Sequence, residues 1–111
     1  MERICTKEDA QNLIKSQELC VVYFTGSDCG ACEVIKYKVE VILQKYPQIK
    51  GIEINGAQYP QIAASYHVYT LPIMILFVEG KESVRESKHL DLLEFERKLQ
   101  RYVEMMGCTT K

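Results

Sequence analysis

Apolar residues gather along the chain in short unbroken runs that alternate with stripes at helical spacing. Residues 18–24 and 72–78 are almost entirely apolar, which is typical of strands buried on both faces of a sheet. Between them, residues 35–46 carry apolar side chains on one helical face, and a proline ends that pattern. Residues 49–54 form a further predicted strand, and Pro60 begins a short predicted helix.

Each end of the chain adds a predicted helix that begins at a capping residue. Thr6 precedes a short amphipathic stripe, and the residues before it, 3–5, form a predicted short strand. Asp91 precedes an apolar stripe that ends at Met106. Because the side chains of Thr and Asp accept hydrogen bonds from free N–H groups at a helix start, both positions predict N-caps.

The order of these elements predicts the fold class. Strands and helices alternate along most of the chain, whereas Glu79 and Gly80 form a predicted turn that pairs the second apolar run with residues 82–87 in an antiparallel hairpin. Such an order predicts an α/β fold with a central mixed sheet of four to five strands and helices on both faces. We expect one domain over residues 1–106 and a flexible tail over 107–111.

The composition agrees with a single globular domain. The chain has 111 residues, of which 47% are hydrophobic and 26% charged, and this excludes intrinsic disorder. Its net charge of −1 offers no broad attraction for nucleic acid or an acidic membrane. The apolar runs are too short to span a bilayer, and no secretory signal is visible. We therefore expect a cytoplasmic protein with no nucleic-acid or membrane partner.

The cysteines provide the candidate chemistry. Their number, five, is odd, and only Cys29 and Cys32 form a close pair, whereas Cys5, Cys20 and Cys108 are scattered. In a reducing cytosol such pairs are usually catalytic or metal-binding. The other cysteines and the two histidines supply no second pair at zinc-ligand spacing, and so short a disulfide loop would stabilise the fold by only about 2 kcal/mol. Redox chemistry is therefore favoured over a metal site or a structural disulfide.

The position of the pair strengthens this interpretation. Cys29 lies where the first apolar strand gives way to its helix, and a helix start offers free N–H groups and the positive end of the macrodipole. A thiolate at Cys29 would be stabilised there, which lowers the pKa of such thiols. Cys32 follows one turn later, so we expect Cys29 to attack a disulfide and Cys32 to resolve the mixed disulfide. Cys20, within a strand, is predicted to be a small buried hydrophobe.

Two segments of the chain resemble the thioredoxin family. Residues 22–32 are similar to its active-site segment, and residues 66–72 lead into 77–80 with the spacing of its cis-proline and its Phe-x-x-Gly turn. The resemblance covers residues 3–106 and implies a complete thioredoxin fold. It implies a protein-disulfide oxidoreductase that takes part in electron transport and cell redox homeostasis. Neither a metal nor an organic cofactor is needed for this chemistry.

The resemblance also implies roles for individual residues. Cys29 would be the nucleophile and Cys32 the resolving thiol; Pro72 would be cis and face the pair, and Leu71 would offer its backbone to an extended substrate segment. The alternative for Pro72 is a trans proline that starts a strand. The candidate site consists of Cys29 and Cys32, supported by Tyr23, Asp28, Gly30, Ala31, Leu71 and Pro72.

Several residues depart from the family pattern around the nucleophile. Asp28 occupies the usual place of a tryptophan, and its carboxylate is expected to raise the pKa of the Cys29 thiol, so that replacing it by alanine would lower that pKa. Lys88 and His89 occupy positions where thioredoxins have small residues. Lys88 would restore positive potential near Cys29, or both residues would simply form a solvated strand end.

Further departures concern the resolving cysteine. Tyr23 aligns with the family's buried aspartate and is a poor proton acceptor at neutral pH, which leaves water or Glu53 as the base for Cys32. Ala31 replaces the usual proline between the cysteines, which removes a conformational constraint and changes the expected reduction potential.

The leading interpretation is a monomeric protein that exchanges the disulfides of protein substrates. Its expected electron donor is a flavin-dependent reductase or a small thiol. One alternative is a binding or redox-switch module that keeps the fold but has little general reductase activity. The other is a glutaredoxin-like, glutathione-dependent reductase, since Thr70, Leu71 and Pro72 are similar to the turn of that family.

Overall fold

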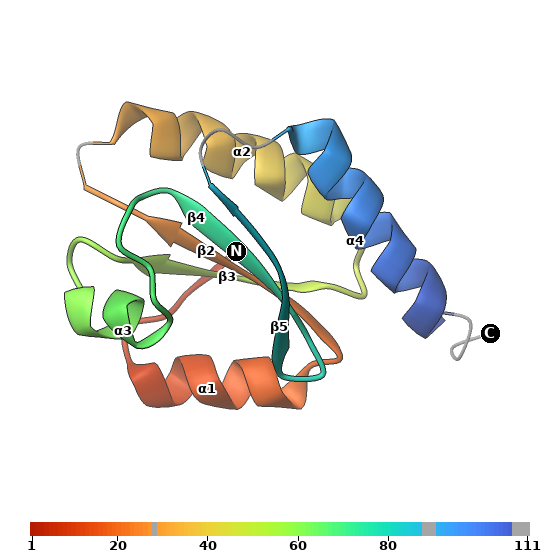
Figure 1. Cartoon of the computed structure of the whole chain (residues 1–111), viewed down its shortest axis with the longest axis horizontal. Coiled ribbons are helices and arrows are strands. Elements are labelled where there is room, and N and C mark those ends of the chain that lie inside the picture. Colours follow the sequence, from red (N-terminus) through yellow and green to blue (C-terminus); the bar gives the residue numbers. More distant parts are fainter. Residues whose placement is uncertain (28, 88–90, 108–111) are drawn as a thin grey trace.

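The elements follow the predicted order. The computed structural model describes residues 1–27, 29–87 and 91–107, and within them five strands form one mixed sheet in the order β1-β3-β2-β4-β5 (Figure 1). In chain order the elements are β1 (Glu2–Arg3), α1 (Lys7–Ser16), β2 (Leu19–Thr25), α2 (Gly30–Gln44), β3 (Lys50–Asn55), α3 (Pro60–Ser65), β4 (Ile73–Val78), β5 (Lys81–Ser87) and α4 (Leu92–Gly107). The predicted α/β class and the mixed sheet are confirmed.

The sheet is parallel on one side of β2 and antiparallel on the other. β3 runs parallel to both β1 and β2, whereas β4 pairs antiparallel with β2 and with β5. All seven residues of β2 are buried, as expected for a strand covered on both faces. Because β2 is buried along its whole length, its carboxyl end is held firmly in place. The loop that leads to the start of α2 therefore begins at a fixed point.

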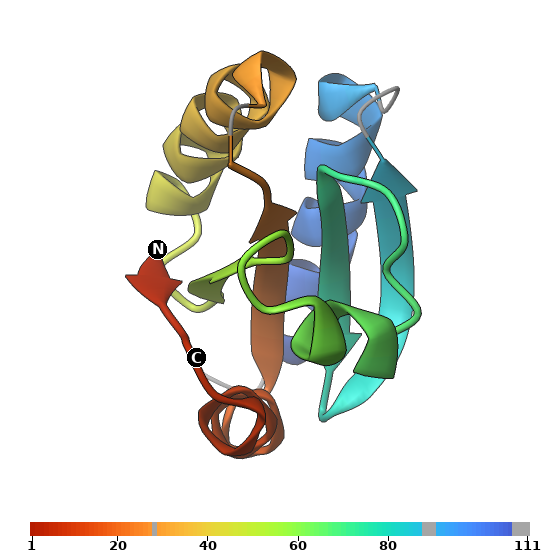
Figure 2. The ribbon, with the colours of Figure 1, turned by 90° about the vertical axis from the view of Figure 1, so that its left-hand side faces the viewer.

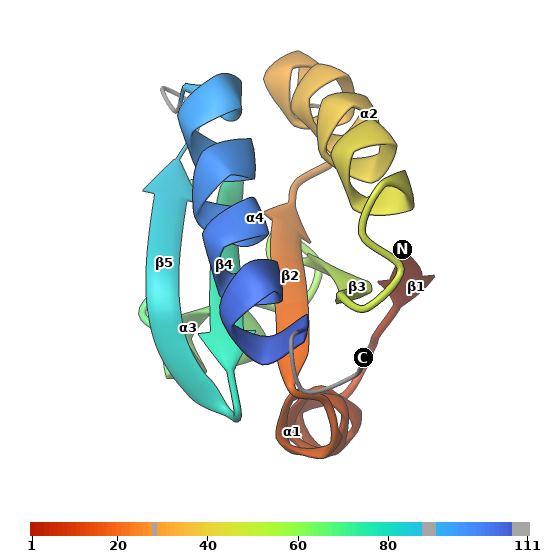
Figure 3. The same cartoon turned by 90° about the vertical axis from the view of Figure 1, so that its right-hand side faces the viewer.

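Two hydrophobic cores lie on opposite faces of the sheet. Helices α1 and α3 cover one face, and α2 and α4 cover the other (Figures 2 and 3). Because successive side chains of a strand point to opposite faces, Val22 and Phe24 enter the first core, whereas Val21 and Tyr23 enter the second. Residue 23 thus faces the same helix, α2, that carries the cysteine pair.

The predicted caps and turn are present. The Thr6 hydroxyl accepts a hydrogen bond from the N–H of Asp9 at 3.1 Å, and the Asp91 carboxylate accepts from the N–H of Leu93 at 3.0 Å. The turn between β4 and β5 has positive φ at both Glu79 (50°) and Gly80 (82°), as a two-residue hairpin of type I′ requires.

Element ends differ from the predictions by one or two residues. The first strand covers Glu2–Arg3 rather than 3–5, although Ile4 extends the pairing because its N–H donates to the Glu53 carbonyl at 2.9 Å. Helix α4 continues through Gly107, which was expected in the tail, and residues 108–111 lie outside the described residues. None of the described helices is long and apolar enough to cross a membrane.

Candidate active site

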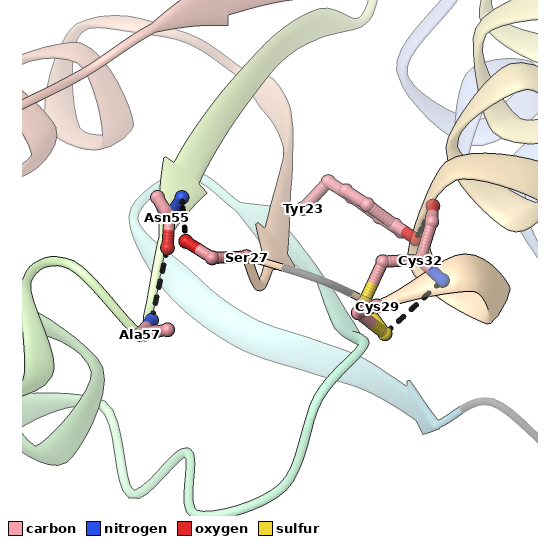
Figure 4. The surroundings of a disulfide bond; sticks show 6 residues. All are labelled: Tyr23, Ser27, Cys29, Cys32, Asn55 and Ala57. Atoms are coloured by element: carbon pink, nitrogen blue, oxygen red, sulfur yellow. Dashed lines mark hydrogen bonds between the residues drawn. A yellow bond between two sulfur atoms is a disulfide. The ribbon is translucent and has the colours of Figure 1, made fainter.

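Cys29 caps the N-terminus of α2. Its Sγ accepts a hydrogen bond from the N–H of Cys32 at 3.2 Å, in the place where Ser, Thr or Asp usually offers an oxygen (Figure 4). Its carbonyl receives the N–H of Glu33 at 3.4 Å, the first bond of the helix. The sulfur of Cys29 therefore lies among free N–H groups at the positive end of the helix, where a thiolate is stabilised.

The two cysteines form a disulfide whose partners differ in exposure. The Cα atoms of Cys29 and Cys32 are 5.2 Å apart. Cys32 has no exposed surface, whereas Cys29 is half-buried. An incoming disulfide therefore has access to Cys29 but not to Cys32, which agrees with the expected order of attack.

The loop before α2 is held by the end of β3. The Asn55 amide donates to the Ser27 hydroxyl at 3.4 Å, while its carbonyl oxygen accepts from the N–H groups of Ala57 (3.0 Å) and Gln58 (2.9 Å) (Figure 4). The backbone continues this connection, since the N–H of Gly56 donates to the Thr25 carbonyl at 2.8 Å. Two neighbouring parallel strands thus fix the approach to Cys29.

The segment that contains Pro72 lies against the same loop. The Leu71–Pro72 peptide bond is cis, as the resemblance implied, and Pro72 is buried. A Cβ added at Gly26 would lie 2.9 Å from Leu71 Cδ1 and 3.8 Å from Cys29 Cβ, so the Leu71 side chain occupies the space beside Gly26. Segments more than forty residues apart in sequence meet next to the disulfide.

Tyr23 supports α2 from the central strand. Its hydroxyl donates to the Cys32 carbonyl at 2.6 Å, and its side chain is fully buried (Figure 4). Burial, together with the negative charges of Glu33 and Glu53, raises the pKa of this phenol well above its usual range. Tyr23 therefore remains a hydrogen-bond donor and does not act as a base.

A charged pair lies beside Tyr23. Glu53 is opposite Tyr23 in the β2–β3 register and is only 8% exposed. Its Oε2 lies 3.2 Å from Nζ of Lys36, which follows Cys32 by one turn of α2. The side chains of Glu53, Lys36 and Thr25 line a pocket of about 390 Å³. The Thr25 hydroxyl is buried and has no hydrogen-bond partner in the part of the chain described.

Glu53 was predicted from the sequence as a candidate base, whereas Lys36 and Thr25 were not predicted as site residues. The single carboxylate between Ile52 and Ile54 marked Glu53 within an apolar strand. The spacing of four residues between Cys32 and Lys36 was the available signal for the lysine, but its pairing with β3 depends on how α2 packs on the sheet.

The other candidate residues fall into two groups. Gly30 and Ala31 are exposed in the first turn of α2, and a Cβ at Gly30 would meet nothing within 4 Å. The proposed effects of Asp28, Lys88 and His89 concern positions outside the described residues.

The remaining described cysteines are free. Cys20 is fully buried in β2, as predicted, and burial raises the pKa of its thiol to about 12. Cys5 is exposed and forms a hydrogen bond with the Tyr59 hydroxyl, while Cys108 lies outside the described residues. Within the described residues, no group of three His, Cys, Asp or Glu side chains is arranged to hold a metal ion.

Two cysteines that close a disulfide across one helical turn can carry two electrons to or from another disulfide. This geometry defines the class of dithiol–disulfide exchange proteins. The thioredoxin family model matches residues 2–101, and the chain belongs to the thioredoxin family. The chain is accordingly a thioredoxin-like thiol–disulfide oxidoreductase.

Individual relatives and structures agree with this assignment. The chain is 29% identical to "Thioredoxin-like protein YdfQ" of Bacillus subtilis over 82% of this chain and 81% of that protein. It is 31% identical to "Thioredoxin H-type" of Fagopyrum esculentum over 70% of this chain and 67% of that protein. The structure of Fasciola hepatica thioredoxin superposes with a TM-score of 0.82 at 28% identity, covering 92% of this chain and 99% of that one.

Proposed function

We propose that the protein reduces disulfides of protein substrates through Cys29. The Cys29 thiolate attacks one substrate sulfur, forms a mixed disulfide and releases the other substrate sulfur as a thiolate. Cys32 then loses its proton and attacks Cys29 Sγ, which forms the intramolecular disulfide and releases the second substrate thiol. The observation that carries this proposal is the disulfide at the helix start, with Cys29 half-buried and Cys32 fully buried.

A substrate segment docks along the backbone of Leu71. The side chain of this residue packs against Gly26 and Gly56, since a Cβ added at either glycine would lie only 2.9 Å or 3.0 Å, respectively, from a Leu71 methyl carbon. The backbone beside the cis-proline is thereby fixed next to Cys29. An extended peptide would pair with the backbone of Leu71 as a short added strand, and this pairing places the substrate disulfide next to Cys29 Sγ.

Glu53 accepts the proton of Cys32. Thr25 and Glu53 are the buried polar or charged side chains among the described residues, and both line the pocket beneath the first turns of α2. A water held by such polar groups would carry the proton from the thiol to the carboxylate. Lys36, at 3.2 Å, holds the carboxylate in place.

The catalytic cycle ends with two electrons from a donor, for which we propose a flavin-dependent reductase or a small thiol. We also propose that the protein is a cytoplasmic monomer that takes part in electron transport and redox homeostasis. The exposed free thiol of Cys5 is suited to a reducing compartment. Donor preference is measured as turnover with a flavin reductase or with glutathione, and strict glutathione dependence would support the glutaredoxin-like alternative.

Insulin reduction by cysteine variants tests the central proposal. In a background with Cys5, Cys20 and Cys108 replaced by alanine, Cys29→Ser is expected to abolish turnover, because the nucleophile is lost. Cys32→Ser is expected to accumulate a mixed disulfide with the substrate, which is detected by mass spectrometry. Insulin reduction that survives Cys29→Ser contradicts the assignment, and the absence of any reduction by the parent protein favours a redox-switch module.

A further inference from the structure

The end of α3 leaves two backbone carbonyls available. The N–H of Val68 donates to the Ala63 carbonyl and that of His67 to the Ala64 carbonyl, both at 2.9 Å, which is the Schellman arrangement. His67 has φ of 57°, in the left-handed region that usually requires glycine. The carbonyls of Tyr66 and His67 lie beyond the last helical bonds of this motif.

Arg85 of β5 donates to both of these carbonyls. Its Nη2 lies 2.6 Å from the Tyr66 oxygen and its Nη1 lies 3.1 Å from the His67 oxygen. Glu82, on the same strand, holds the guanidinium with two further bonds, from Nε at 2.8 Å and from Nη2 at 3.0 Å. The planar guanidinium thus makes four hydrogen bonds, of which two connect the edge strand β5 to the end of α3 and two orient the guanidinium within β5.

This connection lies at the base of the loop that contains the cis-proline. After His67 the chain passes through buried Val68 and exposed Tyr69 to Leu71. One end of the loop is therefore fixed by Arg85, and the other end enters β4 directly after Pro72. The left-handed conformation at His67 is held by the Schellman hydrogen bonds of α3, and Arg85 adds a further bond to the carbonyl of this residue.

We propose that Arg85 is a positioning residue that fixes the loop 66–71 for the docking of protein substrates. The inference rests on the proposed function, in which a substrate segment pairs with the backbone of Leu71. Arg85 acts only through the loop, so it affects substrates that use the loop. A small disulfide that reacts with Cys29 without peptide pairing is not affected.

The test compares two substrates with four variants. Arg85→Gln removes the guanidinium, Arg85→Lys keeps only a point charge, and Glu82→Gln loosens the guanidinium. Lys81→Gln is the matched control, since it removes one positive charge from the exposed start of the same strand. Each variant is assayed with insulin and with a small aromatic disulfide such as dithiobis-nitrobenzoate.

For Arg85→Gln we expect KM for insulin to rise about tenfold, while kcat and the rate with the small disulfide stay within about twofold of the parent. Arg85→Lys and Glu82→Gln are expected to fall between Arg85→Gln and the parent, and Lys81→Gln to match the parent. An Arg85→Gln variant that matches Lys81→Gln overturns the proposal. So does an equal loss of rate with both substrates, which would indicate general damage to the site.

Hydrogen exchange tests the connection between Arg85 and the loop 66–71 without the use of insulin. The amides of His67 and Val68 are expected to exchange about tenfold faster in Arg85→Gln, with no change in the core strands. Unchanged exchange overturns the inference. If the parent protein fails to reduce insulin, the proposed function fails, whereas faster exchange at these amides still identifies Arg85 as the support of the loop.

Discussion

Tyr23, in β2, occupies the position of the buried aspartate of thioredoxins, and its side chain contacts the first turn of α2. Its hydroxyl donates to the Cys32 carbonyl, and its raised pKa keeps the phenol protonated. The proton of Cys32 must therefore go to another group. Glu53 is the buried carboxylate that lies opposite Tyr23 in the sheet, and it is paired with Lys36.

Glu53→Gln is expected to slow the second chemical step rather than the first. A glutamine keeps the shape of the side chain but is not a base, so resolution of the mixed disulfide at neutral pH is expected to slow by about tenfold or more. The defect should shrink as the pH rises, because a Cys32 thiolate that forms in solution needs no general base. Stopped-flow measurement of mixed-disulfide decay against pH provides the test.

Glu33→Gln is the matched control for that measurement. Glu33 also lies near Lys36, at 4.0 Å, but its side chain is 67% exposed. We expect its decay rates to follow those of the parent protein. A slowing that is the same at every pH in Glu53→Gln would indicate a structural effect and remove Glu53 as the base.

At the scale of elements, local sequence was sufficient where local chemistry decides the outcome. The unbroken apolar runs predicted β2 and β4, and the side chains of Thr6 and Asp91 predicted two helix starts. The end of the first strand was misplaced because its pairing depends on β3, which is distant in sequence. Arg85 was not identified, since nothing near it in sequence indicates contact with α3.

The hairpin turn between β4 and β5 carries a residue that is poorly suited to its conformation. Glu79 has φ of 50°. This left-handed backbone conformation is energetically unfavourable for a residue with a Cβ, because the Cβ lies too close to the following carbonyl oxygen. Asparagine tolerates this region better and is favoured before glycine in type I′ turns. Glu79→Asn is therefore expected to raise the free energy of unfolding by about 0.5–1 kcal/mol, as measured by urea denaturation.

Lys81→Asn provides the comparison for this turn. Residue 81 is the first position of β5 and is exposed, and asparagine is disfavoured in strands. We expect this variant to be neutral or slightly destabilised. Stabilisation by both substitutions would mean that the gain comes from asparagine itself or from altered charge rather than from the backbone of residue 79.

On the scale of the whole molecule, β2 joins the two cores and positions the active site. Its side chains fill both faces of the sheet, and its last residue leads to the loop that ends at Cys29. Any change that makes burial of β2 less favourable therefore acts on the fold and on the site together. Ionisation of Cys20 is such a change, because this residue of β2 is a titratable group with no exposed surface.

The buried thiol of Cys20 makes the stability of the protein depend on alkaline pH. Burial raises its pKa from 9.0 to about 12, against a smaller opposing effect of Lys50. Between these values the unfolded chain loses the proton and the folded chain keeps it, so the unfolded state binds fewer protons and stability falls as the pH rises. Below pH 9 the contribution is fully present, and by pH 10.5 about 2 kcal/mol of it should be lost.

Cys20→Ala removes this titration while leaving the other ionisable groups in place. The parent protein and the variant, both in the oxidised form, are compared by urea unfolding at pH 8.5 and pH 10.5. The difference in the free energy of unfolding between the parent and Cys20→Ala should shift by about 2 kcal/mol against the parent from pH 8.5 to pH 10.5, because only the parent has the buried thiol. Cys5→Ala, at an exposed cysteine, should leave the pH dependence unchanged. Parallel curves for the parent and Cys20→Ala would show that the thiol is hydrated in the folded protein, and that β2 is less completely buried than the sheet indicates.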